Sequence, residues 1–343
     1  MKYALNSLKI KMEKIKRNLK ASLAEETWEK VRKIYLFRKF YRLASFELNH
    51  DHRNSIILAG SGRSGTTWIA NIINYNNEYR LMFEPFHPDY SEIGPFIKEY
   101  PYIRVYNDDP LILALADDIL AGRARSIWIN KYNRKIFSSK RIIKAIYANL
   151  LLPWLHQRFS DIPMILLLRH PCAVALSRLR LGWWDPDRIL DRYLGQKELA
   201  QDYLKDIPAI RYKEYSEFEK YIIIWCIENM VPLSQLGKDE IHIAFFENFC
   251  KRPEDEIRKL FTFLKKDVDT DIFRHLDRPS QVVHKRSAII RGEDTAASWK
   301  KYVSQEQIEK ALRILKIFGL DLIYSDFSFP DEQGLQDYMD AKL

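Results

Sequence analysis

Two patterns of apolar residues alternate along the chain. Short continuous apolar runs between polar or turn residues are typical of strands that are buried on both faces. Longer stretches with apolar residues every three to four positions are typical of amphipathic helices. The short runs predict strands at 55–59, 163–168 and 241–246, and the periodic stretches predict helices at 67–74, 173–181, 253–264 and 305–318. Strands that alternate with helices predict a three-layer α/β fold with a mainly parallel central sheet flanked by helices.

The two ends of the chain depart from this alternation. Near the N-terminus, apolar residues recur at helical spacing among lysines and arginines, at Leu8, Met12, Ile15 and Leu19. We therefore expect residues 1–53 to form a basic helical arm. The arm could rest on an acidic membrane or pack on the main domain, and we favour packing. One domain should span 54–325, and 326–343 should form a loose C-terminal tail.

Composition and charge indicate a globular protein with an anionic partner. Of the 343 residues, 47% are hydrophobic and 29% are charged, and the net charge is +9. A basic balance suits a nucleotide, a nucleic acid or a membrane surface. Three cysteines without a CxxC spacing disfavour a disulfide scaffold or a zinc site and are compatible with a reducing compartment. Without a transmembrane run or a signal-peptide pattern, we expect a cytoplasmic protein, with peripheral membrane contact only through the arm.

The segment from Gly60 to Trp68, Gly-Ser-Gly-Arg-Ser-Gly-Thr-Thr-Trp, joins the first predicted strand to the first predicted helix. Its glycines allow tight turns that point backbone N–H groups inward, and the helix N-terminus adds partial positive charge. The glycine spacing nearly fits the nucleotide P-loop GxxxxGK[ST]. However, Thr66 stands at the lysine position, and the loop cation is Arg63. The segment predicts an anion-binding loop that differs from that of a kinase.

A second anion-binding element follows the second predicted strand. Arg169 stands at the strand end, and Ser177 follows eight residues later on the next predicted helix. A guanidinium offers a planar fork of donors to a phosphate, and a hydroxyl donates one more hydrogen bond. A strand-end arginine also commonly pairs with a carboxylate, so this element alone leaves both interpretations open.

Together the two elements resemble those of sulfotransferases that use 3′-phosphoadenosine-5′-phosphosulfate (PAPS). Arg63-Ser-Gly-Thr-Thr-Trp68 is similar to the family's 5′-phosphosulfate loop, with the arginine of the carbohydrate and tyrosylprotein branches. Arg169 and Ser177 have the spacing of its 3′-phosphate element. The resemblance covers about 55–320, is closest to bacterial members, and implies a P-loop-like fold, PAPS as co-substrate, 3′-phosphoadenosine-5′-phosphate (PAP) as product, and no required metal. It implies nucleotide contacts from Gly62, Arg63, Ser64, Gly65, Thr66, Thr67, Trp68, Arg169 and Ser177.

A third segment supports the same family. His284 to Gly292, followed by Ala297-Ser-Trp-Lys300, resembles the basic C-terminal loop that closes over the nucleotide. The resemblance implies contacts from Arg286, Arg291 and Gly292. Which cation of this loop reaches the 3′-phosphate stays open.

The acceptor hydroxyl must lose a proton, and Met82-Phe-Glu84-Pro-Phe-His87 offers two bases. Glu84 lies 21 residues after Arg63, a spacing that resembles the catalytic glutamate of the tyrosylprotein branch, and Phe-Glu-Pro resembles the carbohydrate branch. We expect Glu84 to be the base and His87 to be the alternative base or an acceptor contact. His170 is a weaker alternative. Without a catalytic role, Glu84 would cap a helix or pair with Arg63 or Arg169.

Two further features concern the acceptor side. Family members often place a lysine beside the transferred group, and Lys144 is the candidate, although an ordinary strand-end lysine explains it equally well. The stretch 178–215 is rich in arginine and aromatic residues and could be an acceptor-binding insertion. The resemblance implies a hydroxyl-bearing acceptor, foremost a carbohydrate or glycoconjugate and otherwise a small molecule.

Two other function classes remain as alternatives. A P-loop kinase or NTPase would need a loop lysine and an aspartate at a strand end to hold magnesium, whereas the second strand ends in Arg169. A nucleic-acid-binding protein would explain the positive charge but not the paired phosphate elements, and no nucleic-acid-binding motif is evident. We therefore expect no nucleic-acid partner.

Overall fold

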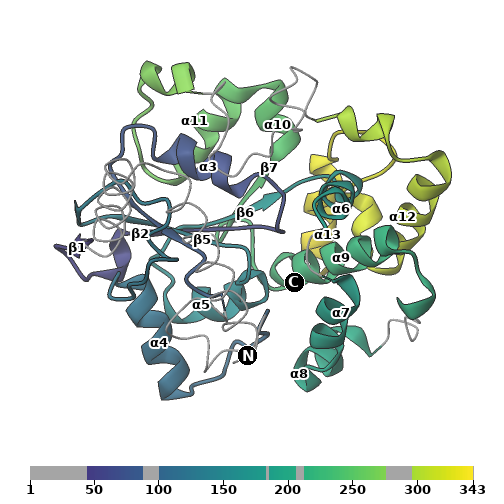
Figure 1. The fold of residues 1–343 in the computed structure, drawn as a ribbon, viewed down its shortest axis with the longest axis horizontal. Helices are drawn as coiled ribbons and strands as arrows, with labels where there is room; N and C mark the ends of the chain where they lie inside the picture. Colours follow the sequence, from purple (N-terminus) through teal and green to yellow (C-terminus); the bar gives the residue numbers. More distant parts are fainter. Residues whose placement is uncertain (1–44, 88–99, 183–184, 206–211, 276–295, 343) are drawn as a thin grey trace, which may run out of the picture.

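A central sheet of five parallel strands organises the protein (Figure 1). The computed structural model describes residues 45–87, 100–182, 185–205, 212–275 and 296–342. The strands lie in the order β3-β5-β2-β6-β7. Their bounds are Arg80–Phe83 for β3, Arg141–Ala145 for β5, Ser55–Ala59 for β2, Met164–Leu168 for β6 and His242–Phe245 for β7. This arrangement confirms the predicted α/β class with a parallel sheet.

Helices cover both faces of the sheet, because successive residues of each strand point to opposite sides. Ile56 and Leu58 of β2 pack with one group of helices, and Ile57 and Ala59 pack with the other. The first group is α3 (Thr66–Ile73), α10 (Phe246–Lys251) and α11 (Pro253–Phe263). The second group comprises α4 (Pro110–Leu120), α5 (Leu152–Arg158), α6 (Pro171–Arg180), α7 (Pro186–Leu194), α9 (Glu217–Gln235) and α12 (Gln305–Ile317). Figure 1 shows α3, α10 and α11 above the sheet and α4 and α5 below it.

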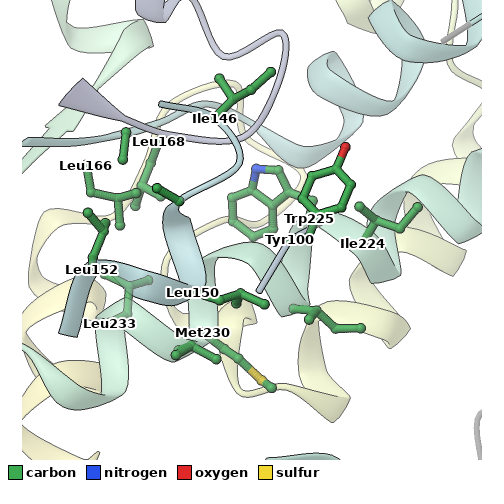
Figure 2. Close-up of a cluster of buried hydrophobic side chains, with 14 of the residues drawn as sticks. Tyr100, Ile146, Leu150, Leu152, Leu166, Leu168, Ile224, Trp225, Met230 and Leu233 are labelled. Carbon is green, nitrogen blue, oxygen red and sulfur yellow. The ribbon is translucent and has the colours of Figure 1, made fainter. Parts of the chain in front are cut away.

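Helix α9 is the centre of the larger core. It begins with a capping box in which Ser216 and Glu219 exchange hydrogen bonds, and the helix is buried along nearly its whole length. Figure 2 shows Trp225 and Met230 of this helix in one hydrophobic cluster with Leu166 and Leu168 of β6. A helix that is apolar on most sides has no amphipathic period, so its sequence gave no helical signal of the kind used above.

The predicted elements lie where the apolar pattern placed them, within one or two residues. The predicted strands correspond to β2, β6 and β7, and the predicted helices to α3, α6, α11 and α12. The pattern did not predict β3 and β5, which carry buried charges. Arg80 and Arg141 each pair with Glu47, at 3.3 and 2.9 Å between nitrogen and oxygen. A distant carboxylate thus makes both arginines tolerable inside the sheet.

The arm and the tail differ from their predictions where the structure describes them. Residues 1–44 of the predicted arm lie outside the described residues. Phe46–Glu47, predicted as helix, instead forms β1, which pairs with β4 (Phe137–Ser138) in a small parallel sheet. In this strand the side chain of Glu47 faces the protein interior, where it pairs with Arg80 and Arg141. The tail is not loose, because α13 (Glu332–Lys342) buries Tyr338 and Met339 in the main core.

The predicted insertion at 178–215 is helical where it is described. It begins within α6 and continues through α7, α8 (Lys197–Leu199) and a π-helical turn at Ala200–Leu204. Tyr193 and Leu199 are buried in the larger core. None of the helices in the described part of the chain combines the length and apolarity needed to cross a bilayer.

Candidate active site

The loop between β2 and α3 depends on two glycines at positions where a side chain would not fit. Gly60 has φ +150°, and a Cβ there would lie 2.5 Å from the backbone oxygen of Leu167. Gly65 caps α3 with φ +99°, and a Cβ there would lie 2.6 Å from the Phe246 ring. Any other residue would strain the turn or push the neighbouring strand and helix away. The two glycines therefore allow the tight turn into the N-terminus of α3 that is typical of an anion-binding loop.

The predicted nucleotide residues from two different strand ends meet at this loop. The Nε of Arg63 donates to Oγ of Ser177 at 3.1 Å. The Nη1 of Arg169 donates to the backbone oxygen of Arg63, also at 3.1 Å. Arg63 has φ +83°, an uncommon left-handed conformation for a residue with a side chain. Ser177 and Arg169 thus hold Arg63 from its side chain and from its backbone.

The two arginines carry charge that is only partly solvated. Burial, together with the charges of Arg169 and Arg178, lowers the pKa of Arg63 to about 10. Burial also lowers the pKa of Arg169, whose guanidinium lies 4.2 Å from the centre of the Phe246 ring. Bringing an anion to this place would offset both the burial and the mutual repulsion. The electrostatics of the loop therefore fit an anionic ligand.

The other predicted loop residues lie at the start of α3. Ser64, Thr66 and Thr67 are buried, and Trp68 packs edge-on against Phe246 at 5.5 Å between ring centres. The predicted contacts Arg286, Arg291 and Gly292 lie outside the described residues. Their assignment stays a prediction.

Several residues at the loop were not predicted as site residues. Asn149 accepts from the Gly60 amide at 3.0 Å, and Asn229 donates to the Ser61 hydroxyl at 3.0 Å. Arg178 donates from Nε to the Gly62 carbonyl at 3.1 Å and from Nη2 to Glu228 at 2.8 Å. A signal was present in the sequence. Glu228-Asn229 interrupts a long apolar run, and buried polar residues in such runs almost always have a specific partner.

Glu84 and Lys144, both predicted, form a buried ion pair on adjacent strands. Glu84 directly follows β3, is 2% exposed, and pairs through Oε1 with the ammonium of Lys144 on β5. Its Oε2 accepts from the Ile146 amide at 2.8 Å. Burial raises the pKa of Glu84, while Lys144 and this amide oppose the rise. Glu84 thus forms an ion pair with Lys144, whereas its noncatalytic interpretation predicted a pair with Arg63 or Arg169.

The two histidines occupy different surroundings. His87 lies one turn after Glu84, and its ring centre is 4.4 Å from that of Tyr147 and 5.4 Å from that of Trp128. His170 instead caps α6 and stacks on Trp299 at 4.2 Å. Burial lowers the pKa of His170 to about 3. His170 therefore has a structural role at the start of α6, and His87 is the histidine beside Glu84.

A row of buried aromatic rings connects the Glu84 segment to the loop. Tyr100 lies 4.7 Å from Tyr147 and 5.3 Å from Tyr193, between ring centres. The charges of Glu228, Arg178 and Glu84 all act on the pKa of Tyr100, which burial raises. Tyr100 thus lies between the two charged parts of the site. Within the described residues, no three His, Cys, Asp or Glu side chains are grouped to hold a metal ion.

An arginine-bearing loop before a helix N-terminus on a parallel sheet is typical of anion-binding α/β proteins, and sequence comparison identifies the family. The family model of the sulfotransferase domain matches residues 53–319. The chain therefore belongs to the sulfotransferase family. No curated protein sequence matches it.

Solved structures with a similar fold include sulfotransferases of very different sequence. The sulfotransferase domain of the curacin biosynthetic pathway is 16% identical, with 76% of this chain and 96% of that chain covered and a TM-score of 0.44. Mouse sulfotransferase SULT7A1, solved in complex with PAP, is 14% identical, with 88% and 93% covered and a TM-score of 0.46. The sulfotransferase from Alicyclobacillus acidocaldarius is 13% identical, with 80% and 97% covered and a TM-score of 0.40.

Proposed function

We propose that this protein transfers a sulfuryl group from PAPS to an acceptor hydroxyl, foremost of a carbohydrate or glycoconjugate. One observation carries the nucleotide half of the proposal. Arg63 and Arg169, from two strand ends, meet Ser177 at the loop before α3 in a chain of the sulfotransferase family. Two cations and a hydroxyl at one helix N-terminus suit a ligand with two anionic groups.

The nucleotide would bind with its two anionic ends on different elements. The loop amides and Arg63 would hold the 5′-phosphosulfate, together with Thr66 and Thr67 at the start of α3. Arg169 and Ser177 would hold the 3′-phosphate, with the basic segment that contains Arg286 and Arg291 closing over it. The arginines supply the positive charge, so the proposal requires no metal ion. A kinase is not favoured, because the loop lacks the lysine that neutralises transferring phosphates.

The reaction would exchange one bond to sulfur for another. The acceptor oxygen would form a bond to sulfur in line with the leaving group, the bridging S–O bond would break, and PAP would leave with the electron pair. Arg63 would stabilise the charge that grows on the bridging oxygen, because preorganised cations act most strongly where charge develops. Glu84 would accept the hydroxyl proton, and His87 is the alternative base.

The Glu84–Lys144 pair supports this division of roles. Burial favours the protonated form of Glu84, and the adjacent ammonium favours the carboxylate, so the two influences on its proton affinity oppose each other. A base must start ionised and end protonated. Lys144 would lie beside the transferred group, where its charge also attracts the sulfuryl oxygens.

The acceptor and the cellular setting rest on the sequence alone. The arginine-type loop and the Phe-Glu-Pro segment resemble the carbohydrate branch. A small hydroxyl-bearing metabolite is the second acceptor class. We place the enzyme in the cytoplasm, with peripheral membrane contact through the basic arm. An acceptor screen with radiolabelled PAPS tests this part.

Calorimetric titration tests the proposed nucleotide. We expect PAP to bind with and without EDTA, and more tightly than ATP with magnesium. Loss of PAP binding in EDTA, or tighter binding of ATP with magnesium, would reject the sulfotransferase proposal in favour of a P-loop kinase.

A further inference from the structure

Arg178 is a buried arginine that contacts the backbone of the loop between β2 and α3. It is 1% exposed and follows Ser177 on α6. Its Nε donates to the carbonyl of Gly62, and its Nη2 donates to Glu228 on α9. The hydroxyl of Tyr193 donates to the other oxygen of Glu228 at 3.3 Å. Through the side chain of Arg178, helices α6, α7 and α9 are thus linked to the carbonyl of Gly62.

Stability alone does not account for this arrangement. Taking a guanidinium and a carboxylate out of water costs about as much as their attraction returns, and apolar residues of similar volume often serve a core as well or better. The next residue of α9, Asn229, holds Ser61. Neighbouring positions of one helix therefore secure Ser61 directly and Gly62 through Arg178. This concentration of polar contacts on two adjacent loop residues indicates a role for the loop itself.

We propose that Arg178 and Glu228 are positioning residues that orient the loop for the 5′-phosphosulfate. The inference rests on the proposed function. Glu228 fixes the guanidinium plane, and the guanidinium fixes the Gly62 carbonyl. Because a peptide group is planar, fixing the Gly62 carbonyl also fixes the direction of the Arg63 amide. Arg178 then acts through the backbone, whereas Arg63 would act on the ligand.

The competing explanation is that Arg178 only adds positive charge near the ligand. It already lowers the pKa of Arg63 by its charge, so such a field exists. The two explanations predict opposite effects of Glu228→Gln. Removing a negative charge should strengthen anion binding if the field matters. It should weaken binding if Glu228 serves to hold Arg178 in place, since an amide is a poorer partner for a guanidinium.

The test is a titration of wild type and Glu228→Gln with PAP and with adenosine 3′-phosphate, which lacks the 5′-phosphate. We expect Glu228→Gln to weaken PAP about tenfold, the effect of losing one charge-assisted hydrogen bond. Affinity for adenosine 3′-phosphate should stay within about twofold, because that ligand does not use the loop. Unchanged or tighter PAP binding by the variant, or equal losses for both ligands, would overturn the inference.

Two further variants guard against misfolding. Tyr193→Phe removes only the hydroxyl that holds Glu228, and we expect a loss of about two- to threefold for PAP and none for adenosine 3′-phosphate. Glu219→Gln, on the same helix but in its N-terminal capping box, also removes one negative charge but keeps the cap, and it should not change the affinity for either ligand. Failure of wild type to bind PAP would reject the proposed function as well. If wild type binds PAP and neither Glu228→Gln nor Tyr193→Phe weakens that binding, only the positioning role is rejected.

Discussion

The proposed nucleotide side of the site, around the loop, and its proposed acceptor side, around Glu84, are built differently. The loop residues Gly60 to Trp68 are contiguous, and the turn and helix they form follow from their own conformational preferences. Glu84 depends instead on Lys144, which lies 60 positions away on the neighbouring strand. Both sides place a key residue in the left-handed region, Arg63 with φ +83° and Glu84 with φ +48°. Backbone strain is common at functional sites, but only the first is part of a recognisable motif.

The two sides also differ in how their charged side chains are arranged. The nucleotide side gathers like charges, which lower the pKa of Arg63. The acceptor side pairs opposite charges in a buried place. An anion should therefore bind on the first side, and a proton should move on the second. The following experiments separate the two.

Replacing Glu84 with glutamine should have the largest effect. The amide keeps the size and removes the basicity, so turnover should fall about 10²–10⁴-fold while PAP affinity stays near that of wild type. Turnover is measured with saturating PAPS and acceptor, and PAP affinity by calorimetry. Active Glu84→Gln with inactive His87→Ala would make His87 the base. If both stay active, the base lies outside this segment.

A buried carboxyl behind the nucleotide side should make stability depend on pH. Burial raises the pKa of Glu247 from 4.5 to about 7, despite hydrogen bonds from the His170 amide and Tyr324. Because the folded state holds the proton more tightly, this contribution is present below pH 4.5 and is lost as the pH rises to about 7. The unfolding free energy of wild type, relative to Glu247→Gln, should fall by about 3 kcal/mol between pH 4 and 8. Denaturant titrations that show no such fall would place the carboxyl's pKa near its ordinary value.

Replacing Arg169 with alanine should affect one ligand far more than another. We expect PAP to weaken about 10- to 150-fold, the effect of losing a charge-assisted bond, and adenosine 5′-phosphosulfate to weaken much less because it lacks the 3′-phosphate. Competition binding measures both ligands. Arg169 also contacts the Arg63 backbone, so equal losses would mean that it acts only as a support for the loop.

Replacing Ser177 with alanine should have the smallest effect. The loss of one neutral hydroxyl should weaken PAP about two- to tenfold. Ser234→Ala on α9, whose hydroxyl donates to the Val231 carbonyl of the same helix, is the matched control and should not change PAP affinity. A loss as large as that of Arg169→Ala would show that Ser177 is needed mainly to orient Arg63.

The parts that could be predicted from sequence are those encoded locally. Strands β2, β6 and β7 are uninterrupted apolar runs, and the phosphate loop is a short motif. Strands β3 and β5 escaped prediction because Arg80, Arg141 and Lys144 break their apolar pattern. Each of these charges is satisfied by a carboxylate that is distant in the sequence, Glu47 or Glu84. The role of Arg178 could not be predicted in this way, because it depends on Glu228. The two residues come into contact only when helices α6 and α9 pack together.

The convergence of Arg63, Arg169 and Arg178 has a consequence for how the protein responds to its solution. Like charges held together by the fold lower its stability, and a polyanion that binds only the folded state raises the melting temperature by mass action. Sulfate or phosphate should therefore raise the melting temperature more than chloride at equal ionic strength. Both should also compete with the nucleotide, so a phosphate buffer would mask activity. A thermal-shift screen of anions can thus rank ligands before any acceptor is known.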